Sequence, residues 1–104
     1  MQFIIHAEGH SLPLDIPDHL LTEAEGFFSK LDEDMARGRQ MGQRWVEQPN
    51  QEERCKVAAA RLLDAMHQGN AELGLLLAAY ILARRPGTSA VRIDESDLNA
   101  TEFG

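Results

Sequence analysis

The chain has 104 residues, of which 43% are hydrophobic, so it is long enough for one compact domain with an ordinary core. Its 17 Asp and Glu residues against 10 Lys and Arg residues give a formal charge of −7, and the resulting field repels phosphate backbones and anionic lipid head groups. The composition therefore argues against nucleic acid and membranes as partners.

Cysteine usage and the apolar segments indicate where in the cell the protein is located. Cys55 is the only cysteine, so an intrachain disulfide is excluded and a reducing compartment is indicated. The opening MQFIIHAEGHS has no basic segment before its short apolar run, and it predicts a strand rather than a secretory signal. The longest apolar run, LGLLLAAYILA, is shorter than the roughly 20 residues that cross a bilayer. We therefore expect a cytoplasmic protein.

Two short aliphatic segments at the N-terminus, QFIIH and LPLDI, flank a turn that contains Gly9. Glycine adopts the positive φ that a tight hairpin turn requires, so the pair predicts a β-hairpin. Leu12, Leu14 and Ile16 alternate with proline or acidic positions, which indicates one buried face. Pro13 has no amide to donate to a neighbouring strand, and this predicts an edge strand.

Apolar or small residues then recur at steps of three or four from position 20 to position 45, which predicts one long helix over residues 18–48. Pro17 suits its first turn and Pro49 ends it. At ~1.5 Å per residue this helix is roughly 45 Å long, whereas a globule of this size is about 35 Å across. The helix therefore bends at a glycine, or its far end projects toward another surface.

A second helix is predicted over residues 51–68, with Cys55 and Met66 among its buried positions and Gly69 directly after it. Asn70 is a suitable N-cap for a third helix, which ends at RRPG, where two cations lie at the negative pole of the helix dipole. The alternating segment AVRID then predicts a third strand.

These elements predict an α+β fold of order ββαααβ, with the helices on one face of a small antiparallel sheet. The last strand is expected beside the first and antiparallel to it, since two strands alone are marginally stable and the three helices pack up, down, up. Residues 1–94 form the predicted compact domain, and residues 95–104 are expected to be a loose polar tail.

The segment DEDMARGRQMGQRWVE carries the main functional hypothesis, because it contains two glycines and the only tryptophan. Each glycine inside a helix costs about 1 kcal/mol relative to alanine, so two of them four residues apart indicate close contact with another backbone. The predicted interaction surface, on the second half of the long helix, consists of Met35, Gly38, Met41, Gly42 and Trp45. Methionine and tryptophan are common at interfaces, which favours a small self-associating module, for example a homodimer, or binding to another protein.

Two alternatives for this segment stay open. Another helix of the same chain can fill the glycine strip, with Trp45 in the core. The glycines can instead break the helix, so that RGRQMG is a loop. The change from acidic to basic residues is itself typical of ion pairs along a solvated helix face, such as Glu33 with Arg37.

A second hypothesis is an enzyme or small-ligand binder in which Arg37, Arg39 and Arg44 contact an anion, with His6 or His10 nearby. The motifs GxxxxGK[ST], GxGxxG and GxSxG are absent, so the sequence favours a protein that is not an enzyme and that uses no cofactor. A third hypothesis, in which the acidic surface binds a basic partner, has support only from the net charge.

The histidines and the cysteine give further expectations. Neither HExxH nor paired CxxC occurs, so no metal site is predicted, although His6, His10 and Glu8 can meet across the first hairpin. Cys55 lies on the apolar stripe of its helix, which predicts an inert buried thiol. Tyr80 is expected in the core, with a hydrogen-bond partner for its hydroxyl.

Overall fold

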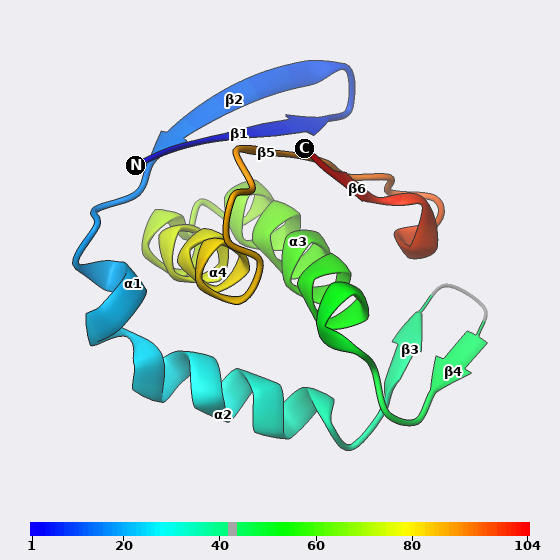
Figure 1. The fold of residues 1–104 in the computed structure, drawn as a ribbon. Helices are drawn as coiled ribbons and strands as arrows, with labels where there is room; N and C mark the ends of the chain where they lie inside the picture. The colour runs from blue at the N-terminus through cyan, green and yellow to red at the C-terminus, as the bar shows by residue number, and fades with distance from the viewer. Residues whose placement is uncertain (42–43) are drawn as a thin grey trace.

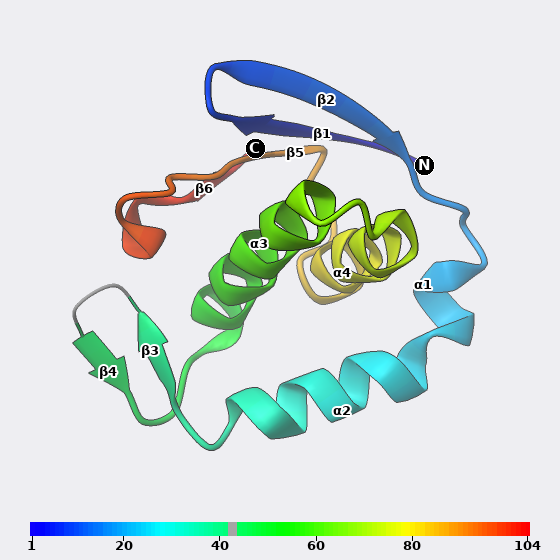
Figure 2. The same cartoon turned by 180° about the vertical axis from the view of Figure 1, so that it is seen from behind.

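The computed structural model describes residues 1–41 and 44–104, including their side chains except those of residues 39–41 and 44. The elements are β1 (Gln2–Ala7), β2 (His10–Asp15), α1 (Leu20–Glu23), α2 (Glu25–Met35), β3 (Arg39–Met41), β4 (Arg44–Val46), α3 (Gln51–His67), α4 (Ala71–Arg84), β5 (Ala90–Arg92), the 3-10 helix η1 (Leu98–Ala100) and β6 (Glu102–Phe103). In Figures 1 and 2 the main sheet lies over α3 and α4, and α2 lies on their other side. The α+β class is confirmed.

The main sheet has the strand order β2-β1-β5-β6, and β3 pairs with β4 in a separate sheet. β1 and β2 form the predicted hairpin, whose turn consists of Glu8 and Gly9 with φ of 54° and 76°, as a tight hairpin turn requires. Pro13 lies in β2, which is an edge strand as predicted. Of the expected buried face, Ile16 is fully buried, whereas Leu12, toward the turn, is 42% exposed.

The direction of the last predicted strand is wrong. β5 lies beside β1, but the two strands are parallel, with His6 opposite Arg92. The prediction required three helices that run alternately up and down the sheet. In both ribbon views α3 and α4 are inclined to one another, so the number of helices does not fix the direction in which the chain re-enters the sheet.

The long helix predicted over residues 18–48 is also wrong, because α1, α2, β3 and β4 take its place. Ala24, with φ −92° and ψ 14°, separates the single turn of α1 from α2. α2 ends at Met35, and Gly38 then adopts φ +101°, a conformation that side chains rarely tolerate. The apolar stripe extended past Met35 only because glycines counted as small positions, and Gly38 is a turn residue. Gly42 lies outside the described residues.

The final residues are not the loose tail that was predicted for residues 95–104. β6 pairs antiparallel with β5, and the amide of Gly104 donates to the carbonyl of Ala90 at 2.9 Å. Thr101 is 2% exposed, and its hydroxyl accepts a hydrogen bond from the amide of Asp94 at 3.2 Å. A strand of two residues is too short to produce a periodic pattern, so the polar composition concealed it.

α3 and α4 match the second and third predicted helices closely. Asn50 and Glu53 form a capping box at the start of α3, and the Asn70 side chain accepts a hydrogen bond from the amide of Leu73 at the start of α4. The core lies between these helices, α2 and the inner face of the sheet, and its largest buried side chains include Tyr80, Phe3, Phe28, Ile16, Met35, Leu62 and Leu77. None of the described helices has the length and apolar character needed to cross a membrane.

Candidate functional site

The segment with the predicted interaction surface forms the β3–β4 hairpin, which stands beside the N-terminus of α3, away from the main sheet (Figures 1 and 2). Its strands pair antiparallel, with Gln40 opposite Trp45. Trp45 is 56% exposed, the largest value among the exposed large hydrophobic side chains that the structure describes. Because a tryptophan gains much from burial, an indole left half in water indicates an incomplete contact.

Trp45 lies against Gly38, at the turn between α2 and β3. A Cβ atom at Gly38 would lie 2.6 Å from Cζ2 and 3.0 Å from Cε2 of the indole. The close contact that a glycine permits is therefore made, but with the tryptophan of the same chain rather than with another helix. Gly38 thus holds the indole against the turn while the rest of the side chain stays in solvent.

The other members of the predicted surface are placed differently. Met35 is fully buried in the core, where it cannot reach a partner. The backbone of Met41 lies in β3, but its side chain and Gly42 are outside what the structure describes. Of the predicted set, Trp45 is the side chain that is shown to be exposed, so the candidate surface is the hairpin rather than a helix face.

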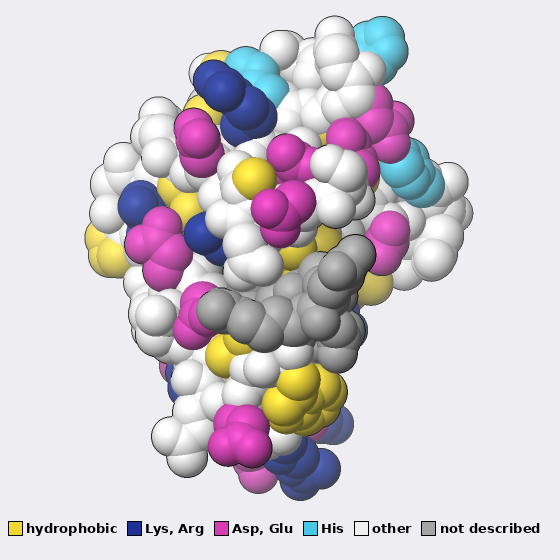
Figure 3. All heavy atoms as spheres, turned by 90° about the vertical axis from the view of Figure 1, so that its right-hand side faces the viewer, with side chains coloured by type: hydrophobic (Ala, Val, Ile, Leu, Met, Phe, Trp, Pro, Cys, Tyr) yellow, Lys and Arg dark blue, Asp and Glu magenta, His cyan; other side chains and the backbone are white. Residues whose placement is uncertain are grey.

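The hairpin is a basic segment of an acidic protein. Residues 36–46 contain Arg37, Arg39 and Arg44 and no acidic residue, whereas the chain has a formal charge of −7. Arg37 is exposed. Figure 3 views this side of the molecule, and at its lower end a hydrophobic patch lies next to both basic and acidic side chains. The hairpin therefore offers an aromatic group within a positively charged segment.

The structure does not place these arginines near His6 or His10. The β1–β2 hairpin lies on the sheet side of α3 and α4 in both ribbon views, and the β3–β4 hairpin lies apart from it, beside the N-terminal end of α3. An anion site built from Arg37, Arg39 and Arg44 together with either histidine is therefore not supported by the fold.

His6 instead belongs to a row of polar side chains across the main sheet. The strand register places Ser11, His6, Arg92 and Glu102 side by side on four strands. His6 Nδ1 and Ser11 Oγ are 2.7 Å apart, and Arg92 Nη1 lies 4.0 Å from Glu102 Oε2. Because Ile5, the neighbour of His6, is buried against the helices, the row lies on the opposite face of the sheet.

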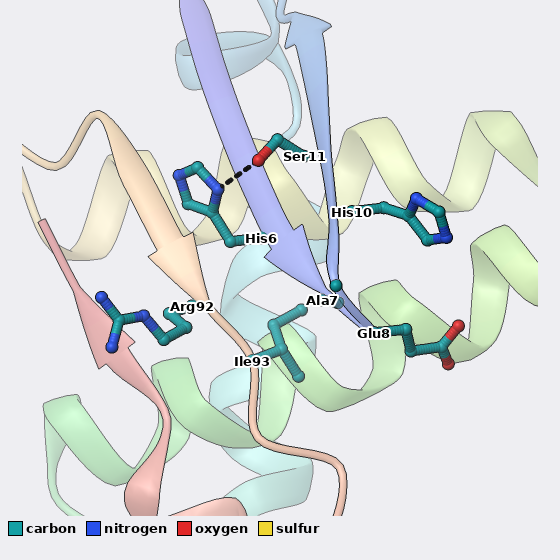
Figure 4. A pocket seen from close by; sticks show the side chains of 8 residues that line it. His6, Ala7, Glu8, His10, Ser11, Arg92 and Ile93 are labelled. Atoms are coloured by element: carbon teal, nitrogen blue, oxygen red, sulfur yellow. Dashed lines mark hydrogen bonds between the residues drawn. The ribbon is translucent and has the colours of Figure 1, made fainter.

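A hollow of about 420 Å³ opens beside this row, lined by His6, Ala7, Glu8, Gly9, His10, Ser11, Arg92 and Ile93. In Figure 4, His6 and Arg92 lie on the same side of the strands, whereas His10 and Glu8 extend away from them. The Glu8 carboxylate pairs instead with His67 at 2.8 Å. His6, His10 and Glu8 therefore do not converge, and the described part of the chain contains no group of three or more His, Cys, Asp or Glu side chains that could hold a metal ion.

The pair formed by Ser11 and His6 does not have the surroundings of a nucleophilic site. A serine nucleophile needs a base that is oriented by a third group, which in the common triads is a carboxylate. The strand neighbour of His6 on its other side is Arg92, a cation. The row can contact an anion more readily than it can activate a hydroxyl.

A polar cluster that no sequence motif predicts joins α2 to α3 and α4. Asp32 accepts a hydrogen bond from the Tyr80 hydroxyl, and its carboxylate lies 2.8 Å from Arg84 Nε and 3.6 Å from Arg54 Nη1. Arg84 also pairs with Glu25 at 2.9 Å. The hydroxyl of Tyr80 thus has the partner that was expected for it. Tyr80 and Arg84 lie 48 and 52 residues from Asp32 in the sequence, so no local pattern could identify them as its partners.

The charges of this cluster stabilise the packing of α2 against α3 and α4. Hydrogen bonding to Glu25 raises the pKa of Arg84, and the same contact lowers the pKa of Glu25. Burial, followed by the hydrogen bond to Asp32, raises the pKa of Tyr80. Both residues of the Arg84–Glu25 pair therefore stay charged and Tyr80 stays neutral at neutral pH. Cys55, on α3, is fully buried as expected, and burial raises the pKa of its thiol to about 11.

Comparisons of the chain with protein-family models, with curated proteins and with solved structures find no match. The geometry of the described residues therefore carries the functional argument.

Proposed function

We propose that this protein is a small protein-interaction module that self-associates through the β3–β4 hairpin, with Trp45 at the centre of the contact. The observation that carries the proposal is the 56% exposure of Trp45 on a hairpin whose described strands, β3 and β4, form a sheet separate from the main one. The long helix that first suggested an interaction surface does not form, but the same segment supplies the exposed aromatic group.

The contact with Gly38 makes Trp45 a suitable anchor. An indole buries a large apolar area, and tryptophan is among the residues most often found at the energetic centre of an interface. Part of the ring already lies against Gly38, so binding orders the side chain less than it would order a tryptophan in open solvent. The cost of association in side-chain entropy is correspondingly small.

The charge of the hairpin favours a second copy of the same chain as its partner. Arg37, Arg39 and Arg44 make the hairpin positive, while the remaining surface of a chain with a formal charge of −7 is strongly acidic. Opposite charges raise the association rate and select the orientation of the encounter. The single cysteine also fits a reducing compartment such as the cytoplasm, which we propose as the location.

The test is the molar mass in solution, measured by light scattering over a dilution series for the natural chain and for Trp45→Ala. We expect the natural chain to exceed 11.6 kDa at high concentration and to approach it on dilution, and Trp45→Ala to stay at 11.6 kDa throughout. Circular dichroism checks that Trp45→Ala is folded. A natural chain of 11.6 kDa at every concentration, or equal masses for the two proteins, would contradict the proposal.

A charge test accompanies it. Arg37→Ala should weaken association, and the loss should be larger at low salt because salt screens the attraction. Arg61→Ala is the matched control, since Arg61 is an exposed arginine on α3. Equal effects of the two substitutions would show that net charge, and not the hairpin, determines association.

A second candidate function is the binding of a small anion by the row Ser11, His6 and Arg92. The ion pair between Arg92 and Glu102 supports it, because both side chains are about three quarters exposed (75% and 72%) and 4.0 Å apart, so the pair is weak and Arg92 can accept a ligand. We expect inorganic phosphate to raise the unfolding temperature of the natural chain but not of Arg92→Gln, at matched ionic strength. An equal rise in both would contradict this function.

A further inference from the structure

We infer that Trp45 binds in an apolar hollow on a second copy of this chain, at the far end of α3. The inference rests on the proposed function and names the surface that receives the tryptophan. The hollow has a volume of about 320 Å³ and lies where β2 meets the connection between α3 and α4, and its lining residues are Leu14, Met66, Gly69, Ala71, Gly74 and Leu75.

The hollow exists because small residues line it. Gly69 has φ +73°, and a Cβ atom there would have no heavy atom within 4 Å. Gly74 lies in α4, where a Cβ atom would be 3.5 Å from Cδ1 of Leu62. Together with Ala71 these glycines leave space between the larger side chains of Leu14 and Met66. All the lining residues are aliphatic, thioether or glycine, so the natural occupant is apolar rather than charged.

The volume suits an aromatic side chain. An apolar cavity of about 150 Å³ in a protein is large enough to bind benzene. The hollow here, at about 320 Å³, has room for the two fused rings of an indole. Leu12, which is 42% exposed and points to the same side of β2 as Leu14, adds apolar surface that an incoming hairpin can cover.

The tryptophan of the same molecule cannot reach this hollow. Trp45 precedes α3, while Met66 is in the last turn of α3 and Gly69 follows it. With 17 residues, α3 is about 25 Å long at ~1.5 Å per residue. The β3–β4 hairpin and the α3–α4 connection lie at its opposite ends in Figure 1. A contact between them therefore joins two copies of the chain.

The charges around the two surfaces are complementary. Residues 36–48 around Trp45 contain three arginines and one acidic residue, Glu47, whereas Asp15 and Glu72 follow lining residues of the hollow and are exposed. No Lys or Arg occurs among the lining residues or directly beside them in the sequence. The carboxylate of Asp15 is 94% exposed, although it lies 3.5 Å from the amino terminus. The electrostatic attraction therefore orients the hairpin of one copy toward the hollow of the next.

This contact uses different surfaces on the two copies, so a pair keeps one free hollow on the first copy and one free hairpin on the second. Such a head-to-tail contact continues into chains or closes into a ring, whereas a contact between identical surfaces stops at a dimer. The inference therefore extends the expected homodimer to an open chain, whose mass rises with concentration, or to a closed ring of fixed mass.

The test combines two variants, each with one of the surfaces destroyed. Trp45→Ala removes the tryptophan and keeps the hollow, and Ala71→Leu fills the hollow and keeps the tryptophan. Each variant alone should have a mass of 11.6 kDa. An equimolar mixture has one intact contact per pair, so we expect a complex of twice this mass and nothing larger. Tryptophan emission should shift to shorter wavelength only in the mixture, because the Ala71→Leu copy holds its only indole.

The outcomes separate this inference from the proposed function. If Trp45→Ala is monomeric but Ala71→Leu associates like the natural chain, the hollow is not the receiving surface and the proposed function stands. If Trp45→Ala associates like the natural chain, the proposed function itself fails. Ala100→Leu, an exposed alanine in η1, is the control and should keep the natural mass. Ala71→Met is a second filling variant if circular dichroism shows that Ala71→Leu does not fold.

Discussion

The two halves of the segment that was predicted to be one helix behave differently. Asp32, in α2, bonds to residues of α3 and α4, and the side chains of Asp32, Arg84 and Arg54 are only 19–26% exposed. The β3–β4 hairpin pairs with itself, and Trp45 is 56% exposed. The first half became a helix because partners distant in sequence hold it, and the second half formed a local hairpin around Gly38. Substitutions in the first half should therefore affect folding, and those in the second half should affect association.

Asp32→Ala is expected to have the largest effect on stability. It removes the carboxylate that Tyr80, Arg84 and Arg54 share, and it leaves part-buried donors without their acceptor. The free energy of unfolding should fall by about 3 kcal/mol, as for the loss of one partner from a buried ion pair. Urea denaturation of the two proteins measures this difference.

Glu33→Ala is the matched control for Asp32→Ala, because Glu33 is an exposed carboxylate of the same helix, directly beside Asp32. Its substitution should change stability by no more than about 0.5 kcal/mol, as is usual at a surface position. Equal losses for the two variants would mean that the cluster does not hold α2 against α3 and α4.

The pH dependence of stability tests the core beside α2, where the thiol of Cys55 is buried. Burial raises the pKa of Cys55 from 9.0 to about 11, so the native thiol keeps its proton at a pH where the unfolded thiol has lost it. The stability that this proton contributes is complete below pH 9 and is lost as the pH rises toward 11. The free energy of unfolding should therefore fall by up to about 2 kcal/mol over this range.

Urea denaturation at several pH values measures this loss, and Cys55→Ala shows how much of it comes from the thiol. The fall between pH 9 and pH 11 should be smaller in Cys55→Ala, with a remainder from Tyr80, whose pKa is also raised by burial. An unchanged slope in the variant would refute a contribution from Cys55.

The fold could be predicted from the sequence where its signals are local. Asn70 marks the start of α4, and Gly9 marks the first turn, because caps and turns depend on neighbouring residues. The direction of β5 and the pairing of Phe103 were missed, because the partner strands determine both. The helix prediction from apolar residues spaced three or four apart failed beyond Met35, since this spacing also arises when apolar residues surround a turn.

The candidate site could be predicted only in part. Trp45 was identified because it is the only tryptophan, but its exposure depends on the hairpin that replaced the helix. The hollow was not identified, because Leu14, Met66 and Gly74 come from three elements that only the tertiary fold brings together. Asp32 was placed in an apparent surface charge run, and its partners in α3 and α4 give it a structural role instead.

The smallest change in stability is expected for a glycine-to-alanine substitution. The sign of this change should differ between Gly38, at the turn, and Gly26, in α2. At Gly38 the φ of +101° disfavours a side chain, and the added Cβ would lie 2.6 Å from the ring of Trp45, so stability should fall by about 1 kcal/mol. At Gly26, in α2, a Cβ atom has no heavy atom within 4 Å, so alanine should stabilise the helix by about 0.5–1 kcal/mol. Thermal unfolding measures both changes, and Trp45 emission should change only in Gly38→Ala. An unfolding temperature of Gly38→Ala that equals or exceeds that of the natural chain would show that Gly38 is not required at the turn, and a fall in Gly26→Ala would contradict the prediction for α2.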